Sequence, residues 1–159
     1  MRKIILARVA GFCFGVQRAI DIALKARESN SGKITTLGPI VHNPQVGEKM
    51  LAEGIELAAD LGEIRDGSVI LSAHGVSPEV EDQARSQGLN IIDVTCPFVT
   101  RVHRTARQLV ESGYQLLLLG EKEHKEVKGI LGAIRSHSAG IPTYYVTVIS
   151  GPDDLKTIK

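Results

Sequence analysis

The sequence predicts an α/β fold built from repeated units with mostly parallel sheets. Short apolar runs alternate along the chain with segments whose apolar residues recur at helical spacing. Several of the helical segments end at a glycine, as at Gly54, Gly88 and Gly113, which is typical of a left-handed C-terminal cap. Strands separated by helices of this length form βαβ units, in which helices cover both faces of a sheet.

The predicted elements follow one another in a regular order. Six apolar runs are predicted as strands, at 3–7, 34–37, 69–72, 90–93, 115–119 and 144–149. Five amphipathic segments are predicted as helices, at 16–28, 44–53, 78–87, 98–112 and 126–136. The last ten residues, SGPDDLKTIK, indicate the beginning of a further helix.

Composition and charge are those of an ordinary globular protein. The 159 residues are 43% hydrophobic and 23% charged, enough for one domain or two small ones with a real core. A net charge of +1 gives no indication of a nucleic-acid or membrane surface, and apolar runs such as 116–119 are too short to span a bilayer. The start of the chain lacks a signal-peptide pattern, and two distant cysteines do not form a disulfide framework. We therefore expect a cytoplasmic protein.

A comparison of the chain with itself indicates two repeats. The segments LGPIVHN and LGEKEHK begin at residues 37 and 119. In each, a predicted strand ends at Leu-Gly, and three residues separate this glycine from a histidine. Cys13 precedes His42 by 29 residues, and Cys96 precedes His124 by 28. These offsets predict a first α/β unit at 1–88 and a second unit at 89–159. The alternative is a chance likeness of short loops, because the shared motif is a weak signal.

Six residues with chemically active side chains follow the predicted strands. Ligands of open α/β sheets bind beyond the carboxyl ends of the strands, so we expect these residues to face one cleft. They are Cys13, His42, His74, Cys96, His124 and Glu126.

Each of these residues also has a structural interpretation. A lone histidine at a strand end is more often a turn or capping residue than a ligand, and free cysteines are often buried. Glu126 suits the first turn of a helix, where the dipole favours an acid. His103, within a helical pattern, and His137, in a polar loop, are assigned no role.

The set as a whole favours a metal group beside an anion. Thiolates select zinc, copper(I) or iron–sulfur clusters, and helix N-termini such as the one after Cys13 favour a thiolate. Zinc sites usually contain a close C-x-x-C pair, which this chain lacks. Distant cysteines suit a larger, central group, and histidines bind anions. The residues thus predict a redox metallocluster beside a phosphate-like substrate.

Two alternatives remain open at this point. One is an anion-binding α/β module that uses His42, His74 and His124 without redox chemistry. The other is a mononuclear metal site, such as zinc held by Cys13, Cys96 and histidines.

Five motifs together resemble one enzyme family. GFCFGVQRAI, GPIVHNPQV, SAHGVSPEV, DVTCPFVTRVH and HKEVKGI, in this order and spacing, resemble the N-terminal half of the 4-hydroxy-3-methylbut-2-enyl diphosphate reductases of the non-mevalonate isoprenoid pathway. The resemblance implies three pseudo-symmetric α/β domains around a [4Fe–4S] cluster. This chain would supply two of them, the second incomplete, and the third would be absent.

The resemblance also implies roles for the six residues. Cys13 and Cys96 would be two of three cluster ligands, with the third beyond Lys159. His42, His74 and His124 would bind the diphosphate, with His124 also lining the catalytic pocket beside Glu126, the proton source. The reaction would be a reductive dehydroxylation that gives isopentenyl and dimethylallyl diphosphate, with electrons from a ferredoxin or flavodoxin.

Two departures from the family pattern bear on these expectations. The family usually has His-Pro-Glu where this chain has His124, Lys125 and Glu126, so Lys125 replaces a rigid turn residue and adds a charge. Because the chain supplies only two of the implied cluster ligands, we expect it to be inactive alone.

Overall fold

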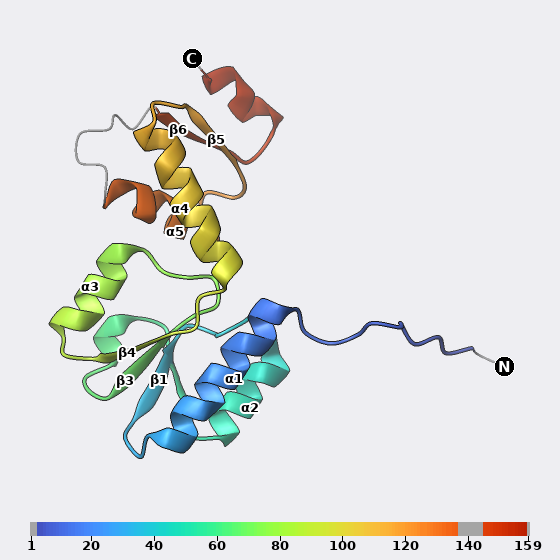
Figure 1. The fold of residues 1–159 in the computed structure, drawn as a ribbon, viewed down its shortest axis with the longest axis vertical. Helices are drawn as coiled ribbons and strands as arrows, with labels where there is room; N and C mark the ends of the chain where they lie inside the picture. The colour runs from blue at the N-terminus through green and yellow to red at the C-terminus, as the bar shows by residue number, and fades with distance from the viewer. Residues whose placement is uncertain (1–2, 137–144, 159) are drawn as a thin grey trace.

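The computed structural model describes residues 3–136 and 145–158, which form α/β structure with parallel strands (Figure 1). The helices are α1 (Phe14–Ser29), α2 (Pro44–Ala52), α3 (Pro78–Ser86), α4 (Pro97–Glu111) and α5 (Lys125–Arg135), with 3₁₀ helices η1 (Leu61–Glu63) and η3 (Pro152–Thr157). The strands are β1 (Ile34–Leu37), β2 (Glu56–Ala58), β3 (Ser68–Leu71), β4 (Asn90–Asp93), β5 (Leu116–Leu119) and β6 (Val146–Ile149). The predicted fold class is confirmed.

The first sheet has four parallel strands in the order β2-β1-β3-β4. Both of its faces are covered, which explains why β3 is buried at every residue. Alternate residues point to opposite faces. Ile70 packs with α1 and α2, whereas Val69 and Leu71 pack with α3 and η1. All four strands therefore end at one edge, where the loops that follow them gather.

The second sheet pairs β5 with β6 in parallel. Its core consists of Ala106 and Val110 from α4 with Ile130 and Ile134 from α5. In Figure 1 this sheet lies above the first, and α4 runs from the first sheet to the second. Within the described residues, no helix is both long and apolar enough to cross a bilayer.

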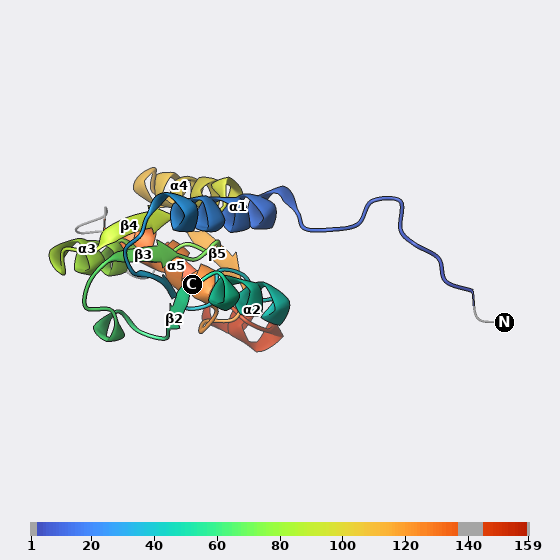
Figure 2. The ribbon, with the colours of Figure 1, turned by 90° about the horizontal axis from the view of Figure 1, so that it is seen from below.

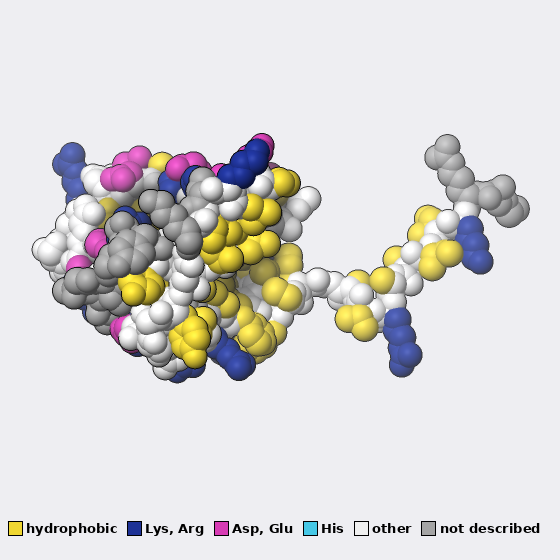
Figure 3. All heavy atoms as spheres, turned by 90° about the horizontal axis from the view of Figure 1, so that it is seen from above, with side chains coloured by type: hydrophobic (Ala, Val, Ile, Leu, Met, Phe, Trp, Pro, Cys, Tyr) yellow, Lys and Arg dark blue, Asp and Glu magenta, His cyan; other side chains and the backbone are white. Residues whose placement is uncertain are grey.

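The predicted strand at 3–7 is wrong. Residues 3–7 form no strand and extend away from the body of the molecule (Figures 1 and 2), with Ile4 86% and Leu6 88% exposed. Figure 3 shows the apolar side chains of this arm uncovered. A strand needs a neighbour for its backbone groups, and the described residues supply none here. Cys13 therefore follows an extended arm rather than a strand.

The other elements lie where the sequence predicts them, with small shifts. α1 begins at Phe14 rather than at residue 16, and the predicted run at 144–149 is a strand from Val146, residue 144 lying outside the described residues. Gly54, Gly88 and Gly113 have φ of 77°, 75° and 85°, which confirms the predicted left-handed caps. The sequence did not predict β2, a three-residue edge strand.

The division into units at 88/89 stays a prediction. Two stretches have the same element order, α1-β1-α2-β2 and α4-β5-α5-β6, with Cys13 and Cys96 as the N-caps of their first helices. β4, however, pairs with β3 in the first sheet, so a division by sheets falls after Asp93.

Candidate functional site

Three loops at the carboxyl edge of the first sheet are joined by backbone hydrogen bonds. The Ala73 N–H donates to Ile40 O, and the Cys96 N–H donates to Ala73 O, each at 3.0 Å. These bonds hold the loops that carry His42, His74 and Cys96 side by side. Three of the six predicted residues therefore lie at the edge where open α/β sheets bind ligands.

His42, His74 and Glu126 form a contact between the two sheets. The rings of His42 and His74 stack, with centroids 4.6 Å apart and planes inclined by 26°. On its other side, His74 Nδ1 lies 3.2 Å from Glu126 Oε1. His74 belongs to the loop after β3 and Glu126 to the first turn of α5, so the contact brings residues from both predicted units together.

The second nitrogen of His74 has no hydrogen-bond partner among the described residues. Its side chain is 17% exposed, and Nε2 is buried without a hydrogen-bond partner. Nδ1 lies against the Glu126 carboxyl group, and a ring that carries a proton on Nε2 would have that N–H left to donate to an anion. A buried polar atom without a partner costs about 1–3 kcal/mol, which a bound anion would offset.

His124 caps α5 and contacts Glu126 through the backbone. Its Nδ1 accepts a hydrogen bond from the Glu126 N–H at 3.3 Å. The neutral ring must then carry its proton on Nε2, which leaves this exposed side chain able to donate to a ligand. This capping bond agrees with the structural interpretation of a strand-end histidine, and it is compatible with ligand binding at the other nitrogen.

The two cysteines occupy equivalent places at helix N-termini. Cys13 is the N-cap of α1 and Cys96 the N-cap of α4; neither side chain makes a capping bond, and both thiols are free. The N-termini of α1 and α4 lie near each other in Figures 1 and 2. Arg18 Nη1 donates to Thr95 O at 3.2 Å and ties α1 to the loop before Cys96.

Gly15 provides the space for the Cys96 side chain. A Cβ at position 15 would lie 3.2 Å from the Cys96 Cβ and closer still to its Sγ. Two thiols at adjacent helix N-termini, one of them against a glycine, suit an iron–sulfur group as two of its ligands. Among the described residues, no three His, Cys, Asp or Glu side chains are arranged to hold one metal ion.

His103 is a member of the site that the sequence analysis missed. Its half-buried ring lies between Gly75 and Gly129, and its Nε2 is buried without a hydrogen-bond partner. Burial lowers the pKa of His103, and the nearby Glu126 carboxylate acts in the opposite direction. The feature of the sequence that could have indicated His103 is its position seven residues after Cys96, which places it two turns along the same helix. His137 lies outside the described residues.

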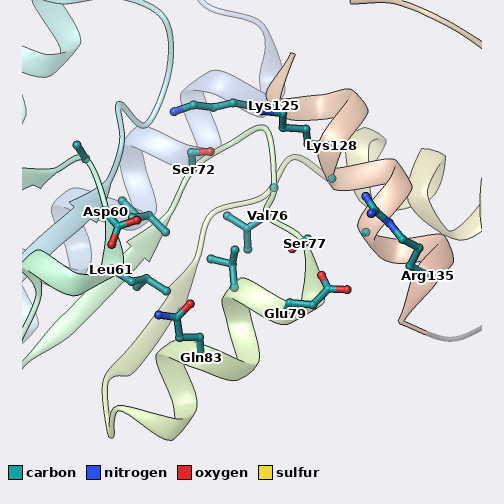
Figure 4. A pocket seen from close by; sticks show the side chains of 16 residues that line it. Asp60, Leu61, Ser72, Val76, Ser77, Glu79, Gln83, Lys125, Lys128 and Arg135 are labelled. Atoms are coloured by element: carbon teal, nitrogen blue, oxygen red, sulfur yellow. The ribbon is translucent and has the colours of Figure 1, made fainter. Parts of the chain in front are cut away.

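A cavity of about 660 Å³ lies elsewhere in the described structure. It is formed between the first sheet, α3 and α5, and Figure 4 shows Lys128 and Arg135 beside it. Lys125 extends to Gly38, where its Nζ would be 2.7 Å from an added Cβ. None of the six predicted residues lines this cavity. We place the candidate site at the histidines because the contacts converge there.

Comparison with known proteins gives one consistent result. The family model described as LytB protein matches residues 4–157. A curated relative from Aquifex aeolicus is 44% identical over 137 residues, which cover 86% of this chain and 47% of the relative. A relative from Wolbachia pipientis subsp. Culex pipiens is 39% identical, and the match covers 98% of this chain and 53% of the relative. Both are named 4-hydroxy-3-methylbut-2-enyl diphosphate reductase.

Solved structures agree with these relatives. A structure of (E)-4-hydroxy-3-methyl-but-2-enyl diphosphate reductase, described as the terminal enzyme of the non-mevalonate pathway, has a TM-score of 0.83 and 40% identity over 98% of this chain and 53% of its own. A reductase structure from Plasmodium falciparum also has a TM-score of 0.83 and 31% identity. The match covers 94% of this chain and 45% of that structure's chain. The chain thus spans about half the length of the proteins it matches.

Proposed function

The chain belongs to the LytB protein family, and we propose that it forms part of a 4-hydroxy-3-methylbut-2-enyl diphosphate reductase. The names of the curated relatives and solved structures support this activity. Because the chain spans about half of their length, the activity is proposed for a longer polypeptide that contains these residues.

The substrate's diphosphate would be bound by His42, His74 and His124. The stacked rings of His42 and His74 and the free Nε2 of His124 present N–H groups from both predicted units. Hydrogen bonds to a charged group are each worth about 1.5–3 kcal/mol, so N–H groups from three imidazoles would together hold the diphosphate.

A [4Fe–4S] cluster would be held in part by Cys13 and Cys96. When bound, such a cluster would supply the electrons for the reduction. The two thiols at helix N-termini and the space left by Gly15 support this assignment. The remaining ligand must come from outside the residues of this chain, since Cys13 and Cys96 are its only cysteines.

Glu126 would donate the proton that makes the hydroxyl group leave. The reaction takes up two electrons and two protons, breaks the C–O bond, and releases the oxygen as water. Hydroxide is a poor leaving group, so a positioned carboxylic acid accelerates this step by about 10²–10⁴-fold. The observation that carries the proposal is the 3.2 Å contact of Glu126 with His74, which supports a proton donor at Glu126 next to a histidine that would bind the diphosphate.

The source of electrons would be a small soluble redox protein, a ferredoxin or flavodoxin, in the cytoplasm. The alternative function, an anion-binding module without redox chemistry, would use the same histidines. The two differ in their dependence on Glu126: reduction requires its proton, whereas binding of a diphosphate does not.

The test is Glu126→Gln in a protein that contains this chain and has the full length of its relatives. We expect unchanged cluster absorbance, near-normal substrate binding and a kcat lower by about 10²–10⁴-fold. Glu121→Gln is the matched control, because this exposed glutamate lies in the same loop before α5. Near wild-type turnover by Glu126→Gln would show that Glu126 is a helix-start acid and not the proton donor.

A further inference from the structure

The cavity between the first sheet, α3 and α5 has no part in the proposed function. Its volume of about 660 Å³ falls within the range of about 300–1,000 Å³ that is usual for small-molecule sites. Its walls combine polar side chains with apolar ones, among them Leu61, Val76 and Val80 (Figure 4). The cavity thus has the size and the mixed walls of a site for an organic molecule that carries a polar group.

Ser72 presents a buried hydroxyl group to this cavity. The residue is only 3% exposed, follows the last residue of β3 and forms part of the cavity wall. Its Oγ makes no hydrogen bond to any described residue. Because a buried polar group without a partner is unfavourable, a ligand that bonds this hydroxyl gains binding free energy.

Lys125 brings an ammonium group to the same strand ends. Its side chain runs from α5 toward the first sheet (Figure 4), and its Nζ would lie 2.7 Å from a Cβ added at Gly38. Gly38 follows the last residue of β1 as Ser72 follows that of β3, and those two last residues are partners in the sheet. Neighbouring strands are about 4.8 Å apart, so Lys125 Nζ and the Ser72 hydroxyl flank one pair of strand ends.

Lys125 is the cation of the cavity that has no partner among the described residues. It makes no hydrogen bond or ion pair with any of them. The other two cations of the wall face acids: Lys128 Nζ lies 2.6 Å from Glu123 Oε2, and the charge of Arg135 acts on Glu79. An anion in the cavity would therefore complete the pairing of Lys125.

The two acids of the cavity wall are already bonded. The pKa of Glu79 is lowered, mainly by a hydrogen bond with the Ser77 side chain. Asp60 Oδ1 accepts a hydrogen bond from the Gly62 N–H at 2.7 Å and caps η1. Neither acid takes up the charge of Lys125, which leaves that charge for a ligand.

We propose that Lys125 Nζ and Ser72 Oγ bind the phosphate group of a small organic phosphate whose apolar part lies in this cavity. Ammonium and hydroxyl groups both donate hydrogen bonds to phosphate oxygens, and lysine is a common phosphate ligand. The apolar part would contact Val76 and Val80. This site is separate from the histidines proposed for the substrate's diphosphate, and it does not depend on the proposed reductase activity.

The test measures the binding of phenyl phosphate to the full-length protein by isothermal titration calorimetry. We expect Lys125→Met and Ser72→Ala each to weaken binding by about 10- to 100-fold, because each removes a hydrogen bond to a charged group. Lys125→Arg should retain most of the affinity, since the positive charge is kept. Lys122→Met is the matched control, because this exposed lysine lies in the loop before α5 and does not line the cavity.

The variant His42→Ala separates this site from the diphosphate-binding histidines. Binding that is weakened by His42→Ala and unchanged in Lys125→Met would place the phosphate at the histidines and overturn the proposal. No binding to wild type at millimolar phenyl phosphate, or equal affinity for benzoate, would overturn it as well. A protein that binds phenyl phosphate with the expected variant effects but reduces no diphosphate substrate would overturn the proposed function and support this site.

Discussion

Gly15 and Cys96 touch across the gap between α1 and α4, and only a residue without a side chain fits at position 15. The Cys96 Sγ lies where a Cβ of residue 15 would point. The contact joins the helix that begins after Cys13 to the cysteine that begins α4. It sets the place of one proposed cluster ligand relative to the other.

Gly15→Ala is therefore expected to displace the Cys96 sulfur. In an ordinary helix the same change would stabilise the protein by about 0.5–1 kcal/mol. Here we expect less visible cluster absorbance per protein after reconstitution. Gly47→Ala in α2 is the control, because nothing lies within 4 Å of a Cβ at that position. Full cluster absorbance in Gly15→Ala would contradict the assignment of Cys96.

Replacing His42 or His74 with alanine should mainly weaken substrate binding. Each lost hydrogen bond to a charged group is worth about 1.5–3 kcal/mol, which corresponds to an increase in KM of roughly 10- to 100-fold. Steady-state kinetics on the full-length protein measure this effect, and visible absorbance reports the cluster. Loss of the cluster in His42→Ala would indicate that His42 is a metal ligand instead.

Lys125→Pro should be tolerated or stabilising by up to about 1 kcal/mol. Lys125 is the first residue of α5, where proline is favoured, and His124 before it has the extended ψ of 138° that proline requires. Lys128→Pro is the contrasting variant, because its N–H donates to His124 O at 3.0 Å, and it should cost about 3 kcal/mol. Thermal denaturation compares the two. Equal losses of stability would show that α5 does not begin at Lys125.

The lowered pKa of His103 predicts a loss of stability in acid. Burial is the main cause of the shift, so the folded ring binds its proton at lower pH than the unfolded one, whose pKa is near the ordinary 6.5. As the pH falls below 6.5, protons therefore favour the unfolded state until the folded pKa is reached. The difference in Tm between pH 8 and pH 5 should be smaller in His103→Gln than in wild type. An equal difference would contradict the burial of this ring as a neutral group.

Much of the fold followed from local patterns in the sequence. Single residues mark several helix ends, because proline and glycine restrict or extend the backbone angles at their own positions. Proline begins the helices at Pro44, Pro78 and Pro97, and glycines in the left-handed conformation cap helix C-termini. The strand predicted at 3–7 was wrong because apolar content indicates a strand, but its backbone bonds depend on a neighbour that the sequence pattern does not specify. β2 was missed because a strand of three residues is too short to show an alternation of apolar and polar residues.

The candidate site was predictable at its strand-end residues but not in its contacts. A position after a strand places His42, His74 and Cys96 at one edge by topology alone. The pairing of His74 with Glu126 depends on how α5 packs against the first sheet, which no local pattern encodes. His103 was assigned no role because its spacing from Cys96 is a weak signal until the fold brings together the two glycines beside its ring.

The central claim is that these residues serve a reductive dehydroxylation and not only the binding of a diphosphate. The most direct measurement mixes the full-length protein, whose cluster has been reduced, with 4-hydroxy-3-methylbut-2-enyl diphosphate. The products formed and the electrons consumed are then quantified. We predict isopentenyl and dimethylallyl diphosphate, with two electrons consumed for each molecule formed. Tight binding of the diphosphate by a cluster-containing protein, without product and without consumption of electrons, would contradict the account.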